Sequence, residues 1–145
     1  MKIRKATKKD ILQIGKLMKI EFNKPPYEDG WTDSSVRRTL NNYFKIGYGF
    51  VVYENKEIIG VIIVRDEPYA KRGYIVIEEL VVKSELQNKG IGKLLMKRVE
   101  REAQKKKACA INLYSSKKSK AFGFYKKLRY KEDKNFAFME KKLKN

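Results

Sequence analysis

The chain has 145 residues, of which 42% are hydrophobic and 12% aromatic, so it can bury a core and is not of disordered composition. It has no histidine and one cysteine, Cys109, which excludes Ser-His-Asp and Cys-His catalysis, histidine metal sites and an internal disulfide. The net charge of +18 favours an anionic partner such as a nucleotide cofactor, although a lysine-rich solvated surface would give the same total.

The N-terminal segment predicts a strand followed by a helix. Residues 1–6 alternate between polar and apolar side chains, as a strand does. Apolar residues then recur at helical spacing over residues 11–18, after Thr7 and Asp10, which have the spacing of a capping box. We expect this helix to end near Asn23, because two prolines follow it.

A loop rich in aromatic and acidic residues comes next, over residues 25–33. Asp33 or Ser34 can cap a second helix, which Gly47 and Gly49 would end. Three strands are then expected in close order, and we predict that they form an antiparallel meander. Their ranges are 50–53, 58–65 and 74–82.

The remaining segment alternates between helices and strands. An amphipathic helix is expected over residues 91–103, and the strand that follows at 108–114 can lie parallel to the previous one because a helix connects them. A helix at 119–128 and a closing strand at 136–143 complete the order. We therefore predict an α/β fold with a mixed sheet and helices on both faces, in a single domain over residues 1–145.

The most informative segment is the turn after the strand that ends at Val82. Its sequence, Gln87-Asn88-Lys89-Gly90-Ile91-Gly92, leads directly into a helix. Glycines allow close approach of the backbone, and the free amides at a helix start attract anions, so this turn predicts a pyrophosphate site. The spacing fits neither a Rossmann fingerprint nor a Walker A loop, and an ordinary strand-turn-helix connection stays open.

This segment, LVVKSELQNKGIG, resembles the acetyl-CoA signature of the GCN5-related N-acetyltransferase (GNAT) family. A second family landmark, Ala-x-x-Phe-Tyr on a later helix, matches residues 121–125, and the order of elements agrees over nearly the whole chain. The sequence departs from the family pattern at three positions. The family usually has proline at Ser84, asparagine at Lys118 and glycine at Arg129.

The resemblance implies a mostly antiparallel sheet with a central parallel strand pair that splays apart, and acetyl-CoA as cosubstrate without a metal. It gives Tyr125 the role of the acid that protonates the departing thiolate. Main-chain groups of the splayed strand would pair with the pantetheine arm, the turn would hold the pyrophosphate, and two further residues would contact the cofactor. In order, these cofactor-binding residues are Leu80, Val81 and Val82, then Gln87, Asn88, Lys89, Gly90, Ile91, Gly92 and Lys93, then Asn112 and Lys118.

An amine nucleophile needs a base, because reaching the neutral form at pH 7 from a pKa near 10.4 costs roughly 4.6 kcal/mol. With histidine absent, a carboxylate is the natural choice. Glu78 and Glu79 lie on the cofactor strand, and only one can face the substrate unless a bulge intervenes. Resemblance to the polyamine and diamine branch favours Glu78, with Glu79 or water alone as alternatives. Either acid could instead pair with a basic residue on the sheet.

The function that we expect is transfer of acetyl from acetyl-CoA to a primary amine: a small amine or diamine, an amino-acid derivative, or a protein N-terminus or lysine. The resemblance implies that the loop from Tyr27 to Asp33 contacts the acceptor, although a solvated loop with Trp31 packed as a lid stays open. A non-catalytic acetyl-CoA-binding module and a basic nucleic-acid-associated protein are the alternatives, although no nucleic-acid motif is present. No apolar run reaches the ~20 residues of a membrane span, so we expect a cytoplasmic protein without a membrane partner. A homodimer stays open.

Overall fold

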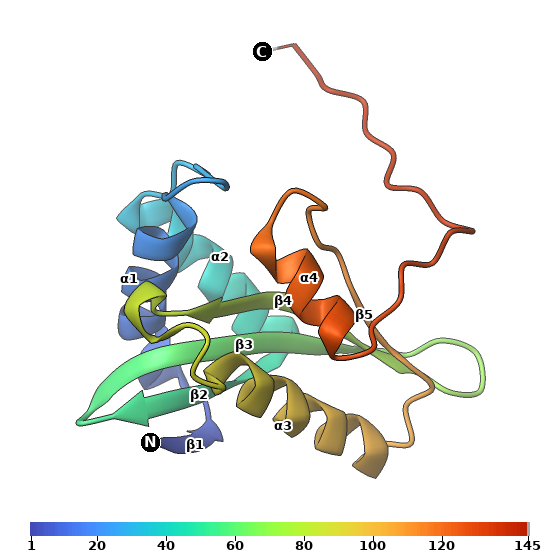
Figure 1. The fold of residues 1–145 in the computed structure, drawn as a ribbon, viewed down its shortest axis with the longest axis horizontal. Helices are drawn as coiled ribbons and strands as arrows, with labels where there is room; N and C mark the ends of the chain where they lie inside the picture. The colour runs from blue at the N-terminus through green and yellow to red at the C-terminus, as the bar shows by residue number, and fades with distance from the viewer. Residues whose placement is uncertain (145) are drawn as a thin grey trace. The chain divides into compact units, whose positions relative to one another are not determined.

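The computed structural model describes residues 1–144 and divides the chain into two compact units, Met1–Tyr114 and Ser115–Asn145. The elements of the first unit follow one another as predicted, with short 3-10 turns before the first and third helices (Figure 1). They are β1 (Lys2–Lys5), α1 (Ile11–Phe22), α2 (Asp33–Ile46), β2 (Tyr48–Glu54), β3 (Glu57–Glu67), β4 (Tyr74–Val82), α3 (Ile91–Lys105) and β5 (Ile111–Leu113).

The five strands form one mixed sheet in the order β1-β2-β3-β4-β5. The pairs from β1 to β4 are antiparallel, whereas β4 and β5 are parallel, which confirms the predicted meander and the predicted parallel pair. The parallel pair is the last in this order, not central as expected. β5 is also shorter than the predicted strand at 108–114, because only three residue pairs join it to β4.

The first unit buries apolar side chains on both faces of the sheet. α1 and α2 cover one face, where Ile14 and Leu40 belong to the same core cluster as Ile63 of β3. α3 covers the other face. It lies so close to β3 that a Cβ added to Gly60 would stand 2.8 Å from Ile91 Cγ2, so a side chain at this position would force Ile91 to shift. The prediction of helices on both faces is confirmed.

Local sequence explains where the first two helices begin. Asp10 accepts a hydrogen bond from the backbone amide of Thr7 at 2.8 Å, which is the carboxylate half of the predicted capping box. The cap of α2 is Thr32, one residue before the predicted Asp33, since its Oγ1 accepts from the Ser35 amide at 3.1 Å. No helix within residues 1–144 is long and apolar enough to cross a bilayer.

The second unit contains α4 (Lys120–Lys127), which confirms the helix expected there. Lys117 and Glu132 form an ion pair at 2.6 Å within this unit. The closing strand predicted at 136–143 is wrong, because residues 134–144 have no strand in the described chain. The alternation of Phe136 and Phe138 with smaller or polar residues is strand-like, but a strand also needs a neighbour that completes its ladder, and sequence alternation alone does not supply one.

Candidate active site

The glycine-rich turn leaves the start of α3 without a side-chain cap. Gly90 is the N-cap residue, with φ of +85°, and a Cβ there would meet nothing within 4 Å. Asn88 is also left-handed, with φ of +63°, so left-handed residues alternate along the turn as they do in anion-binding backbone nests. The free first-turn amides of α3, with the exposed Lys89 and Lys93 beside them, fit a phosphate group.

β4 and β5 separate next to this turn. Their last ladder pair is Ile77 with Leu113, whereas β4 continues to Val82 against β3. Within residues 1–144, no ladder pair joins residues 78–82 to a strand on the β5 side. Gln87 Nε2 donates to the Val82 carbonyl at 3.1 Å, which ties the turn to the strand end. This opening between β4 and β5 fits the pantetheine arm of the cofactor, which the resemblance places against the main chain of β4.

A β-bulge lies at the predicted base. Ile63 of β3 pairs with Glu79 and Val64 pairs with Ile77, so Glu78 is an extra residue in β4. The bulge allows consecutive acids to face the α1 and α2 side of the sheet. Glu79 is opposite Ile63, which belongs to the core under α1 and α2. Glu78 Oε1 accepts a hydrogen bond from Arg65 Nε at 2.5 Å, and Arg65 is two residues along β3 from Ile63.

Glu79 has the surroundings of a group that can exchange a proton near neutral pH. Its Oε1 accepts a hydrogen bond from Tyr43 Oη of α2 at 3.0 Å. Burial raises the pKa of Glu79 to about 7, the Tyr43 hydrogen bond lowers this pKa, and the negative charges of Asp29 and Glu78 raise it. Burial also raises the pKa of the Tyr43 phenol, so Tyr43 remains a donor.

The loop before α2 is held by Asn23 and Trp31. Asn23 Nδ2 donates to the Trp31 carbonyl at 2.9 Å, and the Trp31 amide donates to Asn23 Oδ1 at 2.7 Å. Trp31 Nε1 donates to Asp29 Oδ2 at 3.2 Å. Trp31 packs against the core under α1 and α2, so this loop presents an acid and an aromatic ring on the face that carries Glu79.

The predicted site residues are divided between the two units. Those on β4, on the turn and on β5 lie in the first unit, where Asn112 is exposed and pairs with Val76. Lys118 and Tyr125 lie in the second unit. Tyr125 is the buried residue of α4, with its ring edge-on to Phe124 and Tyr130.

Sequence reasoning missed Tyr43. It continues the inward spacing of Val36 and Leu40 on α2, which predicts that it faces the sheet. Its contact with Glu79 depends on how α2 lies across β4, and local spacing carries no signal for that.

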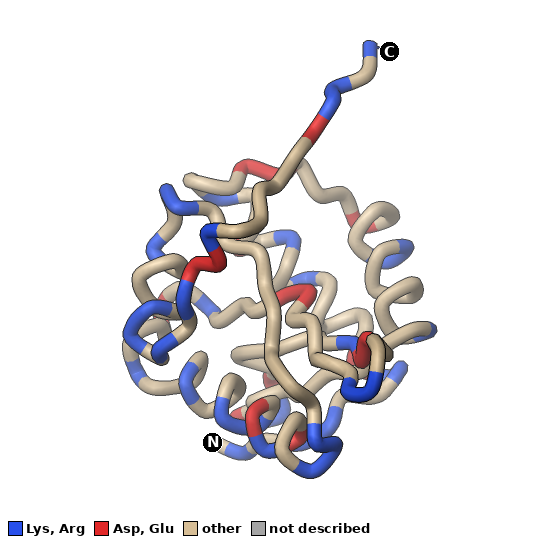
Figure 2. The backbone as a smooth tube through the Cα atoms, turned by 90° about the vertical axis from the view of Figure 1, so that its right-hand side faces the viewer, with Lys and Arg blue, Asp and Glu red and all other residues tan. Residues whose placement is uncertain are grey.

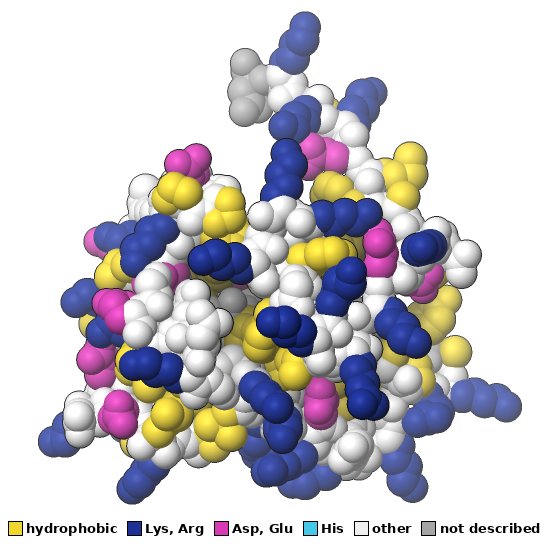
Figure 3. Space-filling view, viewed as in Figure 1, with side chains coloured by type: hydrophobic (Ala, Val, Ile, Leu, Met, Phe, Trp, Pro, Cys, Tyr) yellow, Lys and Arg dark blue, Asp and Glu magenta, His cyan; other side chains and the backbone are white. Residues whose placement is uncertain are grey.

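The positive charge is spread widely and does not mark a site. Lys and Arg positions occur throughout the tube in Figure 2, and Figure 3 shows their side chains scattered over the viewed face among acidic and hydrophobic ones. The bulk charge therefore fits the solvated-surface interpretation as well as the anion-binding one.

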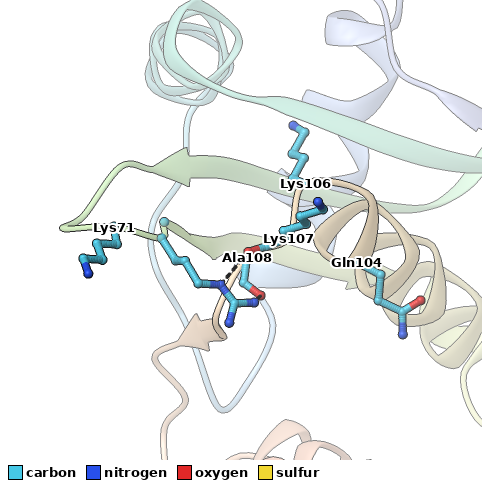
Figure 4. Close-up of a pocket in the computed structure, with 7 residues that line it drawn as sticks. Lys71, Gln104, Lys106, Lys107 and Ala108 are labelled. Atoms are coloured by element: carbon cyan, nitrogen blue, oxygen red, sulfur yellow. Dashed lines mark hydrogen bonds between the residues drawn. The ribbon is translucent and has the colours of Figure 1, made fainter.

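A basic pocket of about 600 Å³ lies at the opposite end of α3 from the glycine-rich turn (Figure 4). Arg72 Nε and Nη2 donate to the carbonyls of Lys107 and Ala108 at 3.0 and 3.2 Å. Lys106 Nζ pairs with Asp66 at 2.6 Å. Arg72 therefore ties the segment before β4 to the segment that follows α3, and the charge of Lys106 is matched by Asp66.

Solved structures share this fold. An acetyltransferase from Trypanosoma brucei is 20% identical with a TM-score of 0.76, over 98% of this chain and 99% of that one. A ribosomal-protein-alanine N-acetyltransferase from Brucella melitensis is 12% identical with a TM-score of 0.79, over 97% of each chain. An aminoglycoside 6'-N-acetyltransferase from Acinetobacter haemolyticus is 12% identical with a TM-score of 0.78, over 99% of this chain and 100% of that one. No curated protein matches the chain closely enough to count as a relative.

The model of the Acetyltransferase (GNAT) family matches residues 18–130. This range includes the bulged strand, the glycine-rich turn and α4, and it crosses the boundary between the two units. The chain therefore belongs to the GNAT family of acetyltransferases, which use acetyl-CoA as cosubstrate.

Proposed function

We propose that the protein transfers the acetyl group of acetyl-CoA to a primary amine, with Glu79 as the base. The observation that carries this proposal is the half-buried carboxylate of Glu79, whose pKa is about 7, on the part of β4 that has separated from β5. A base with this pKa can accept a proton at neutral pH, where the acceptor amine is still protonated as an alkyl ammonium.

The cofactor would lie against residues that the fold leaves open. Leu80, Val81 and Val82 would pair with the pantetheine arm, and the turn from Gln87 to Lys93 would hold the pyrophosphate through the free amides of α3. Asn112 and Lys118 would add polar contacts. Acetyl-CoA supplies an acetyl group that is already activated as a thioester.

The two acids would have different roles. Glu79, held by Tyr43, would take the proton from the acceptor amine. Glu78 shares the Arg65 guanidinium with Glu67, so it would add negative potential, and its ion pair would keep it from taking the proton. Tyr125 would be the acid for the thiolate, whose reference pKa near 8.5 demands little from a phenol. This role is supported by its place in the Ala-x-x-Phe-Tyr landmark on α4.

The acceptor is proposed to be cationic. Asp29 and Glu78 raise the pKa of Glu79, which means that negative potential gathers where an ammonium would bind. Tyr43 and Trp31 add aromatic surface suited to a cation. Small amines and diamines fit this arrangement best. Structures of the same fold include enzymes named for an aminoglycoside and for a ribosomal-protein alanine, so amino-acid derivatives and protein N-termini belong in the same test.

The two compact units would act together as one catalytic domain. The match to the family model runs through both of them, and the proposed acid and the proposed base lie on different units. Neither unit alone would then be active.

The test is thiol release from acetyl-CoA with a panel of diamines, amino-acid amides, and peptides with a free N-terminus or a lysine. We expect Glu79→Gln to lower kcat/KM by about a hundredfold or more with the best acceptor, the range for loss of a general base. Glu78→Gln is the matched control and should retain most activity. Full activity in Glu79→Gln would exclude Glu79 as the base. A larger loss in Glu78→Gln than in Glu79→Gln would assign that role to Glu78.

A further inference from the structure

A small polar cluster joins the end of α1 to the turn after β4. The carboxylate of Glu21, only 8% exposed, accepts hydrogen bonds from Ser84 Oγ and from Lys24 Nζ, the latter at 3.2 Å. Lys24 Nζ also donates to Ser84 Oγ at 3.1 Å. Ser84 is one of the positions where the chain departs from its family pattern, so the hydroxyl contact is a feature of this sequence.

The cluster lies between the two segments that the proposed function uses. On one side, Asn23 is between Glu21 and Lys24 in sequence and holds Trp31 through both amide atoms. On the other side, Ser84 begins the short 3-10 turn that leads to Gln87 and the start of α3. The loop from Tyr27 to Asp33, here called the acceptor loop, is therefore connected through side chains of the first unit to the turn from Gln87 to Lys93, here called the cofactor turn.

We infer that Ser84 is a positioning residue that couples the cofactor turn to the acceptor loop through Glu21 and Lys24. The identity of the two ligands rests on the proposed function. A buried carboxylate that loses a donor is left with an unsatisfied oxygen, so a movement of Ser84 is resisted unless Glu21 follows it. Because Glu21 belongs to the last turn of α1, such a movement reaches Asn23 and hence Trp31.

Trp31 is the single tryptophan of the chain, so its fluorescence reports on the acceptor loop in the intact protein. CoA is the probe, because it carries the phosphates and pantetheine but no acetyl group to transfer. We expect CoA to change Trp31 emission in the unmodified protein. In Ser84→Ala the change should fall to less than half and CoA should bind about two- to tenfold more weakly, as for loss of one hydrogen bond. Ser84→Thr, which keeps the hydroxyl, should restore both.

Two further variants separate coupling from a general loss of structure. Glu21→Gln should reduce the fluorescence response as Ser84→Ala does, whereas Glu85→Gln removes an exposed carboxylate from the same turn and should leave it intact. Thermal stabilisation by CoA measures binding independently of Trp31. If CoA stabilises the protein but Trp31 responds equally with and without the Ser84 hydroxyl, the coupling is refuted. If CoA does not stabilise the unmodified protein, the proposed function fails first and the coupling fails with it.

Discussion

Glu78 and Glu79 show how neighbouring residues of the same type acquire different chemistry. Glu78 pairs at 2.5 Å with the Arg65 guanidinium, which also pairs with Glu67. Glu79 is half-buried and has a phenol as its hydrogen-bond partner. A phenol donates a hydrogen bond without bringing a full positive charge, so the burial penalty on the ionised form is only partly offset. The family resemblance favoured Glu78 as the base, with Glu79 or water alone as alternatives. The contacts that separate the two acids involve Tyr43 and Arg65, which come from other elements and could not enter that prediction.

The raised pKa of Glu79 predicts a pH dependence of stability that needs no activity assay. The pKa is about 7 in the folded chain, against an ordinary value near 4.3 in the unfolded one. The native state therefore binds more protons between these values, and the free energy of unfolding should fall as pH rises through this window, by up to about 4 kcal/mol. Chemical denaturation at a series of pH values measures this.

Three variants test the assignment of that slope. Glu79→Gln should remove it, whereas Glu78→Gln should keep most of it. Tyr43→Phe removes the hydrogen bond that lowers the pKa of Glu79, so the window should extend to higher pH. The acidic limb of the activity profile should then move up in the same variant. An unchanged slope in Glu79→Gln would show that another group titrates.

At the scale of elements, the contact between α3 and β3 fixes where the cofactor turn lies. Gly60 allows Ile91, the first residue of α3, to approach the strand, and Leu95 Cδ1 would stand 3.3 Å from an added Cβ. The start of α3 is also the end of the glycine-rich turn. Packing on the sheet and presentation of the free amides therefore depend on one glycine that is 30 residues away from Gly90 in sequence.

Gly60→Ala should lower the free energy of unfolding by about 1–3 kcal/mol, the usual cost of overpacking a core. It should also weaken acetyl-CoA binding, since the first turn of α3 must move. Calorimetric titration and thermal unfolding measure the two effects. Gly123→Ala is the matched control. It lies in α4 with nothing within 4 Å of the added Cβ, so it should raise stability slightly. A Gly60→Ala protein with normal stability and affinity would contradict this account of the contact.

Elements with strong local signals were predicted well. Three local signals lie within a few residues of the element that they predict: the prolines after α1, the apolar runs of β2 to β4 and the helical period of α3. The sequence allowed a bulge at Glu78 or Glu79 but did not predict one, because a bulge is defined by the register of β4 against β3. The strand expected at 136–143 failed for a related reason. Pairing is a property of two segments, and the pattern of one segment does not decide it.

At the scale of the whole molecule, the charge of +18 must be separated from specific cofactor binding. A surface with lysines scattered over it attracts any polyphosphate at low salt. Contacts of the pantetheine arm with the backbone of β4 are not ionic, so they should survive screening. Binding of acetyl-CoA therefore contains a part that salt weakens and a part that it does not.

Thermal stabilisation by acetyl-CoA and by ATP should diverge as salt is raised. The Debye length falls from about 10 Å at 0.1 M to about 3 Å at 1 M, so the ATP effect should nearly disappear. The acetyl-CoA effect should decrease but persist, at ligand concentrations that give equal stabilisation in low salt. If both effects disappear together, the protein is collecting phosphates on its surface, and the splayed end of β4 is not a pantetheine site.

The bulge in β4 adds a residue without disturbing the phase of the strand around it. Ile77 and Glu79 oppose consecutive residues of β3, so a strand lacking Glu78 would still pair in register and would still direct Glu79 toward α2. Glu78 and its ion pair with Arg65 can therefore be gained or lost by insertion or deletion of one codon, while the proposed base stays in place. Among related sequences, we expect variation at this point of the strand to take the form of gaps as well as substitutions.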